Sequence, residues 1–388
     1  MRHHESTASL PQRGTAGVTE AARRAPRAPL ALLGFGVVSP FGIGVRAFAA
    51  QLRAGRFAAP AQPPAEPGRW PEAAAYWLRD FDAPALLGGK GVATMNRMTH
   101  LALLACGEAL ALRTPRDDTQ RRRSGVVLGS RGGSMQSIAD FVRSTYVGLP
   151  HMVSPMQFPN ATMNGPAGHC AIWHGLEGLN ASVCADELSG LAALHYAARM
   201  LRQGRADHLL AGAVEEFAPY NAWAHEAGRA ADGRPYAEAA VMFALATEAD
   251  DAPAQLLATR LRHLPAGPDG STDLAAGLQR EIEALLEDAG CRPADLAWAL
   301  GGAWSGTAAL PAQQAAFEAV QPGLAGAARR LTAQSPGAFC HAHGAATALD
   351  LATALLAAPS GLGVLTAVGE GGQVGAVLVR KLRHVEDV

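Results

Sequence analysis

A strand, a sharp turn, a long helix and a second strand are predicted within the stretch GLNASVCADELSGLAALHYAARMLRQGRADHLLAGA. Apolar residues at helical spacing from Ser189 onward predict the helix, and Gly204 marks its end. Some enzymes carry their nucleophile where a strand turns abruptly into a helix. Cys184 lies beside this turn, and a helix N-terminus can lower the pKa of a thiol and raise its thiolate fraction. The stretch is therefore a candidate site for covalent catalysis.

The composition limits the functions that such a site could serve. The chain has 388 residues, 49% hydrophobic and 17% charged, with a formal charge of −1. It can bury a large core, and its charge balance suggests neither nucleic acid nor a membrane surface as partner. The five cysteines are scattered and odd in number, which favours reduced thiols and a cytoplasmic protein. No apolar run approaches the ~20 residues that a membrane-spanning helix needs.

The elements that must position the turn fall into two stretches of alternating strands and helices. Residues 1–28 are polar and rich in Arg and Pro, and we predict a disordered leader there. Residues 29–250 and 251–388 each alternate strand and helix patterns, which favours an α/β fold with substantial parallel sheet. In the second stretch, a helix is predicted with Ser271 as N-cap and Gly290 as its stop. We interpret the two stretches as halves of a diverged duplication.

The order of motifs resembles that of the β-ketoacyl-ACP synthases of the thiolase-like superfamily. LLGFGVVSPFGIGVRAFAAQLRAGR resembles the opening strand, Gly-rich loop and helix of that family, and MNRMTHLALLACGEAL its next helix. FPNATMNGPAGHCAIWHGLEGLN resembles the stretch before the nucleophile, HAHGAATALDLATALL the segment around a catalytic histidine, and GEGGQVGAVLVRK the closing hairpin. The resemblance covers residues 30 to 382. It implies a thiolase-like fold, in which two pseudo-repeated α/β halves form a layered α-β-α-β-α core.

The resemblance also implies where catalytic residues should stand, and this chain departs from most of them. Aligned on Ser189 and Gly190, the nucleophilic cysteine position holds Glu187. The first catalytic histidine is replaced by Ala303 or by Trp304, the turn after it survives as Gly306 and Thr307, and the family's lysine is missing from SPGAFCH. The second histidine is retained as His341, with His343 as the alternative match. The gating phenylalanine is replaced by Glu370, where a buried unpaired carboxylate would be costly.

A glutamate at the nucleophile position does not restore the chemistry. A carboxylate near a helix N-terminus gains up to about 1 kcal/mol from the helix dipole. It is nevertheless a poor nucleophile toward thioesters, and the mixed anhydride that it would form hydrolyses easily. Cys184 lies three residues earlier, which is about one helical turn or ~5 Å. That displacement spoils alignment with an oxyanion hole, so we expect Cys184 to be a buried structural cysteine.

The leading hypothesis is therefore a non-catalytic subunit that resembles the chain-length factors of iterative ketosynthase systems. The resemblance implies a heterodimer with an active ketosynthase, and a carrier protein that presents phosphopantetheine-linked acyl chains. Aryl-polyene or polyketide pigment synthesis is the implied setting. The seam between the subunits would lie near GLNASVC and MNGPAGHCAIW. No cofactor is implied, and the spacing of the other histidines does not suggest a metal site.

Three alternatives stay open at this point. The chain could be a malonyl-ACP decarboxylase, since relatives with glutamine at the nucleophile position produce acetyl starters. It could be an active acyltransferase that uses Cys184 with His341. It could also be a scaffold or a docking protein for an acidic carrier protein, using the arginines at 121–123 and at 199, 202 and 205. An obligate partner subunit should be unstable or aggregate alone, because its interface is apolar.

Overall fold

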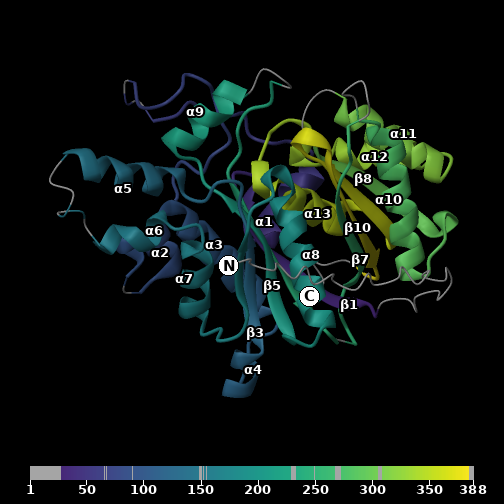
Figure 1. Cartoon of the computed structure of the whole chain (residues 1–388), viewed down its shortest axis with the longest axis horizontal. Helices are drawn as coiled ribbons and strands as arrows, with labels where there is room; N and C mark the ends of the chain where they lie inside the picture. The colour runs from purple at the N-terminus through teal and green to yellow at the C-terminus, as the bar shows by residue number, and fades with distance from the viewer. Residues whose placement is uncertain are drawn as a thin grey trace, which may run out of the picture.

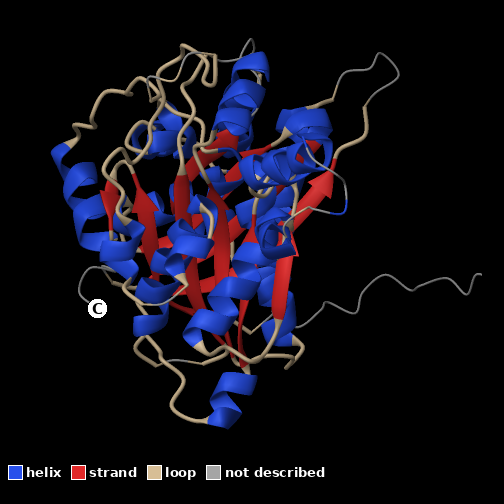
Figure 2. Ribbon diagram, turned by 90° about the vertical axis from the view of Figure 1, so that its left-hand side faces the viewer, coloured by secondary structure: helices blue, strands red, loops and turns tan. Residues whose placement is uncertain are grey.

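Within the described part of the chain, ten strands form one mixed sheet, and Figures 1 and 2 show it running through the molecule. The computed structural model describes residues 28–383 except 65, 67, 90, 148–150, 152, 154, 229–232, 249, 267–271 and 305–307. The strands are β1 Leu30–Ser39, β2 Gly42–Ile43, β3 Ser124–Gly129, β4 Asn180–Val183, β5 His208–Glu215, β6 Ala239–Ala246, β7 Ala254–His263, β8 Leu296–Trp304, β9 Gly361–Val368 and β10 Gln373–Lys381. The predicted leader lies almost entirely outside the described residues.

The α-helices alternate with these strands, as the sequence patterns predict. They are α1 Val45–Ala54, α2 Ala83–Leu87, α3 Arg97–Ala111, α4 Asp118–Arg122, α5 Met135–Val147, α6 Phe158–Ala161, α7 Gly165–His174, α8 Ser189–Arg202, α9 Pro219–Gly228, α10 Leu274–Ala289, α11 Ala309–Val320, α12 Leu324–Thr332 and α13 Ala346–Ala357. Gly290 ends α10 in the left-handed conformation, as predicted. The predicted cap Ser271 lies outside the described residues, and the Asp273 side chain caps α10 by accepting from the Ala276 N–H.

The strand order shows the two halves directly. The order is β4-β3-β5-β6-β1-β7-β10-β9-β8, with β2 paired to β1. In the first half β3 runs parallel to β5, β5 antiparallel to β6, and β6 antiparallel to β1. In the second half β8, β9, β10 and β7 repeat the same sequence of pairings. The halves join through β1 and β7, and the predicted boundary at residues 250 and 251 falls between β6 and β7.

Helices form layers on both faces of each half. Figure 1 shows α3 and α7 against the first half, α10, α11 and α12 against the second, and α8 and α13 in the middle. The sheet is continuous through the β1–β7 pairing, so the two β layers of the predicted α-β-α-β-α core belong to one sheet. All residues of α13 except Ala357 are buried.

Small residues let the two central helices approach closely. A Cβ added at Gly190 of α8 would lie 2.7 Å from Thr347 Oγ1 of α13. The Thr347 hydroxyl also accepts a hydrogen bond from the Leu191 N–H at 2.9 Å. The absence of a side chain at Gly190 thus lets the N-termini of α8 and α13 lie side by side. No helix within the described part of the chain is both long and apolar enough to span a membrane.

Candidate active site

The predicted turn is a short 3₁₀ segment, η4 Asp186–Leu188, between β4 and α8. Asp186 adopts φ 45°, a left-handed conformation that is strained for a non-glycine residue. The Ser189 hydroxyl holds the turn by donating to the Asp186 carbonyl at 2.6 Å and accepting from the Ala185 N–H at 3.0 Å. This turn directs the next side chain, Glu187, into the protein.

Glu187 is buried beside two histidines from the other half. Only 2% of Glu187 is exposed, against 8% of His341 and 6% of His343. One potential ligand atom of each lies within 4.8 Å of the others. We call these three residues the histidine–glutamate cluster. Burial raises the pKa of Glu187, its own N–H and Arg131 oppose the rise, and Glu370 adds to it. Glu187 Oε2 has no hydrogen-bond partner among the described residues.

The histidine hydrogen bonds determine the tautomers. An Arg131 N–H lies 2.9 Å from His343 Nδ1, and arginine can only donate, so Nδ1 accepts. His343 Nε2 then donates to His225 Nδ1 at 3.0 Å, and His225 Nε2 donates to the Arg234 carbonyl at 2.9 Å. His341 Nδ1 accepts from the His343 N–H at 3.1 Å, so Nε2 of a neutral His341 carries its proton. Burial, reinforced by nearby histidines and arginines, lowers the pKa of His343 well below its usual value.

These bonds also bear on whether the cluster could hold a metal. A metal ion needs an imidazole lone pair from each histidine. The Nδ1 lone pairs of His341 and His343 already accept hydrogen bonds, and the other nitrogens carry protons. A metal would have to displace these contacts and approach the Arg131 cation. The donor set therefore fits a hydrogen-bonded network better than a metal site.

Cys184 is not the buried cysteine that the sequence suggested. It is exposed, directly after β4, which is an edge strand of the described sheet and leaves the residue uncovered. Its thiol donates to the Arg131 carbonyl at 2.9 Å. Glu370 is also exposed, in the 3₁₀ segment η9 Glu370–Gly372, because the closing hairpin carries it to the surface. The expected cost of a buried carboxylate at position 370 therefore does not arise.

The comparisons with known proteins identify the family of this chain. Residues 27–232, more than half of the chain, match the family model "Beta-ketoacyl synthase, N-terminal domain". The chain belongs to the β-ketoacyl synthase family. It is 32% identical to "Putative polyketide beta-ketoacyl synthase 2" of Streptomyces halstedii, covering 86% of this chain and 85% of that protein.

Solved β-ketoacyl synthase structures show the same fold. "The ishigamide ketosynthase/chain length factor" superposes with a TM-score of 0.76 at 29% identity, covering 91% of this chain and 99% of that one. A type II polyketide synthase acyl-carrier protein in complex with its ketosynthase, AntDE:AntF, matches with a TM-score of 0.68, 92% of this chain and 99% of that one. At 19% identity, this second likeness concerns the fold alone.

The family's first histidine position can be placed only in part. Ala303 and Trp304 end strand β8, and their side chains lie outside the described residues. Gly306 and Thr307 lie outside them as well. Their functional roles therefore remain predictions, as do those of Glu187, His341 and Glu370.

Sequence reasoning missed the residues that hold the cluster in place. Arg131 follows β3, and its backbone N–H donates a short hydrogen bond to the Glu215 carboxyl. Burial raises the pKa of Glu215 to about 8, and the same effect raises that of Glu216 to about 7. His225 comes from α9, far from the motifs. Two local signals could have pointed to these residues. Arg131 is the one large residue in the Gly-rich GSRGG, and Glu215 and Glu216 are adjacent glutamates at the end of a predicted strand.

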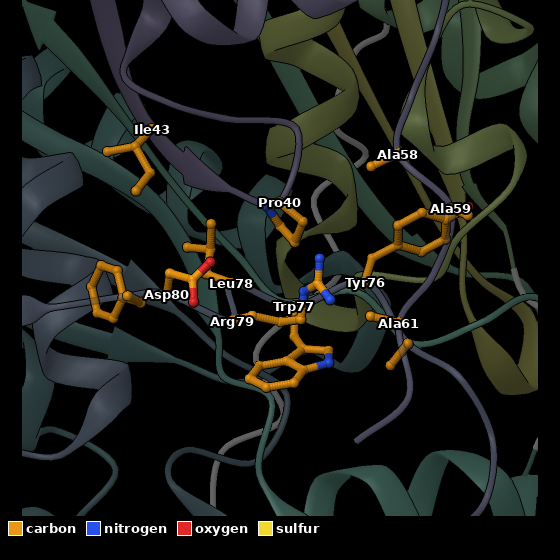
Figure 3. Close-up of a pocket in the computed structure, with 12 residues that line it drawn as sticks. Pro40, Ile43, Ala58, Ala59, Ala61, Tyr76, Trp77, Leu78, Arg79 and Asp80 are labelled. Carbon is orange, nitrogen blue, oxygen red and sulfur yellow. The ribbon is translucent and has the colours of Figure 1, made fainter. Parts of the chain in front are cut away.

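Two other surfaces are separate from the cluster. A cavity of about 310 Å³ is lined by Pro40, Tyr76, Trp77 and Arg79 among others, and by no cluster residue (Figure 3). Arg123, one of the arginines considered for carrier docking, directly precedes β3, whereas Arg131 and the cluster lie at the other end of this strand. Arg123 pairs with Asp207 at 2.6 Å, and Arg202 donates to the Leu257 carbonyl at 2.8 Å.

Proposed function

We propose that this chain is a non-catalytic subunit of the chain-length-factor type, which pairs with an active ketosynthase in polyketide, polyene or fatty acid synthesis. The main support for this proposal is the histidine–glutamate cluster. The nucleophile position holds Glu187, a buried carboxyl beside His341 and His343. The nearby thiol, Cys184, bonds to the Arg131 carbonyl outside the cluster. The likeness to a ketosynthase/chain length factor supports the same role.

In this proposal Glu187 replaces the nucleophile, Ala303 the first histidine and Glu370 the gate, while His341 is retained at the second histidine position. The partner supplies the reacting cysteine and histidines, and a carrier protein brings the phosphopantetheine-linked chain. We further propose a leader at 1–28, ketosynthase-like halves at 29–250 and 251–388, and a cytoplasmic location.

The surface for the partner is proposed at β4 and the helices beside it. In the described sheet β4 pairs only with β3, which leaves its other edge unpaired. Ile172 of α7 is 82% exposed and Phe158 of α6 is 56% exposed, and α7 packs against both α6 and β4. An apolar residue exposed to that extent beside an unpaired strand edge is typical of an interface.

A charge placed in this seam tests the pairing. We expect Ile172→Glu to abolish copurification with a coexpressed ketosynthase, because the interface would have to bury an unpaired carboxylate. Leu382→Glu is the matched control, since Leu382 is also exposed but lies after β10. Equal loss of copurification in both variants, or in neither, would contradict the proposed seam.

Intact-protein mass after incubation with acyl carrier protein thioesters tests the lack of catalysis. We expect the ketosynthase partner to gain the acyl mass and this chain to gain none, alone or in the complex. Acylation of this chain that disappears in Cys184→Ser would show instead that Cys184 is a nucleophile, and the proposal would be wrong.

One observation favours a decarboxylase as the second candidate. His341 Nε2–H is a hydrogen-bond donor of the kind that stabilises the enolate left when a malonyl thioester loses carbon dioxide. The same incubation with malonyl carrier protein distinguishes the two roles. Loss of carbon dioxide that requires His341 would favour the decarboxylase.

A further inference from the structure

Arg131 extends from the buried cluster toward the surface. Its side chain is 35% exposed, whereas Glu187 and His343 are almost completely buried. One guanidinium N–H reaches His343 Nδ1 at 2.9 Å, and Nε lies 3.7 Å from the Asp186 carboxylate. The guanidinium thus touches both turns that form the site, one from each half of the chain.

The backbone of Arg131 is held as firmly as its side chain. Its N–H donates to Glu215, and its carbonyl accepts the Cys184 thiol. Ser130 donates to Glu215 at 3.3 Å and accepts from the Gly133 N–H at 2.9 Å, which closes the loop. A Cβ added at Gly344 would lie 2.7 Å from Arg131 N, so the loop is seated directly on the turn before α13. The side chain therefore has little freedom to leave through backbone movement.

We propose that Arg131 closes this chain's own site, so that an acyl thioester cannot reach Glu187, His341 and His343. The hydrogen bond to neutral His343 and the nearby Asp186 hold the guanidinium across the approach. This inference gives the proposed non-catalytic role a physical barrier in addition to the missing nucleophile. It rests on the proposed function for its biological meaning, but its test requires no partner activity.

The test introduces a reporter thiol by Glu187→Cys in the full chain, with Cys184→Ser and Cys291→Ser to remove the more exposed thiols. Alkylation by iodoacetamide is followed by peptide mass, with the partner present if the two copurify. We expect Arg131→Gly to raise the alkylation rate of the introduced thiol at least about tenfold, equivalent to about 1.4 kcal/mol. Arg79→Gly, which alters an arginine lining the separate cavity, is the matched control.

Two outcomes separate the ways in which Arg131 could act. Arg131→Met keeps much of the unbranched bulk of the side chain but cannot donate, so fast alkylation in this variant assigns the closure to the guanidinium and its hydrogen bond, and slow alkylation assigns it to bulk. Equal alkylation rates in the parent chain, the Arg131→Met variant and the Arg131→Gly variant would overturn the proposal. In the chain bearing native Glu187, acylation at the exposed Cys184 would contradict the proposed function but not the closure, whereas acylation of Glu187 itself would overturn both.

A titration of His343 in the chain that keeps Glu187 gives an independent check if the reporter variant folds poorly. Arg131 lowers the pKa of His343, after burial and two histidines. We expect Arg131→Met to raise that pKa in an NMR titration of the imidazole, with Arg79→Met unchanged. An unaltered His343 titration would show that the guanidinium does not sit on this ring, and the closure would be wrong.

Discussion

The turns that lead into α8 and α13 occupy equivalent places in the two halves, since α8 lies between the parallel strands β3 and β5 along the chain and α13 between the parallel strands β8 and β9. Each is a short 3₁₀ segment, η4 before α8 and η8 His343–Ala345 before α13. Each contains a non-glycine residue with positive φ, Asp186 at 45° and His343 at 43°. Such strain costs on the order of 1–3 kcal/mol and persists only where the surroundings enforce it.

The two turns differ in how their polar groups are satisfied. Both ring nitrogens of His343 are in hydrogen bonds, to Arg131 and His225. Glu187 keeps one buried carboxyl oxygen without a partner in the described part of the chain. The turn before α13 therefore stabilises the fold through its polar side chains, whereas the turn before α8 carries a group that opposes folding when it ionises.

The largest expected effect concerns Glu215, which anchors Arg131 and touches the turn before α13. Its folded pKa of about 8 exceeds the ordinary 4.5, so the folded state binds the extra proton. The stability associated with this group is present at low pH and is lost as pH rises toward 8, at up to about 1.4 kcal/mol per pH unit. We expect Glu215→Gln to flatten this slope in denaturant unfolding between pH 5 and pH 8.

Asp207 provides a control with the opposite sign. Arg123 holds the pKa of Asp207 below its usual value, so its contribution is present at neutral pH and lost as pH falls through the lowered pKa. Asp207→Asn should therefore lower the stability at neutral pH and flatten the acid limb of the profile, while the slope between pH 5 and pH 8 stays that of the parent. A Glu215→Gln variant with the parent slope from pH 5 to pH 8 would show that Glu215 titrates normally.

Removal of the His343 side chain should abolish the advantage of the turn before α13, because this side chain makes its hydrogen bonds. His343→Ala leaves Arg131 and His225 without their shared partner and opens a cavity, so we expect a loss of about 3 kcal/mol in the free energy of unfolding. His174→Ala, which removes one bond to the Leu103 carbonyl, should cost about 1 kcal/mol. Equal losses in the two variants would mean that the histidine network adds nothing beyond single contacts.

The smallest expected effect is a gain in stability, in contrast to the loss expected for His343→Ala. Glu187→Gln removes a carboxyl whose pKa burial raises, so it should increase the free energy of unfolding slightly above that pKa. The gain should fade as pH falls, because Glu187 is then protonated in the folded protein. Thermal unfolding at pH 5 and pH 8 measures both values. Destabilisation at pH 8 would indicate that the Glu187 carboxylate has a partner that stabilises it.

Local patterns in the sequence were enough for several of the elements and for part of the site. Gly290 stops α10 because glycine adopts the left-handed conformation easily, and this depends on one residue. The strand Asn180–Val183 and the helix from Ser189 follow from apolar spacing within the stretch. The family pattern placed Glu187 and His341, and the structure brings them together. Ser271 failed as a cap because a neighbouring acidic residue, Asp273, takes that role.

The sequence by itself determined which residues stand in the two turns, and only the tertiary structure decided what they contact. Arg131 meets His343 across 212 positions, and His343 meets His225 across 118. No periodicity of a helix or strand extends that far, because such contacts depend on how the two halves pack. Cys184 is exposed in the folded chain, although the general tendency of free cysteines had predicted that it would be buried. The closure of the site by Arg131 is therefore a property of the assembled halves.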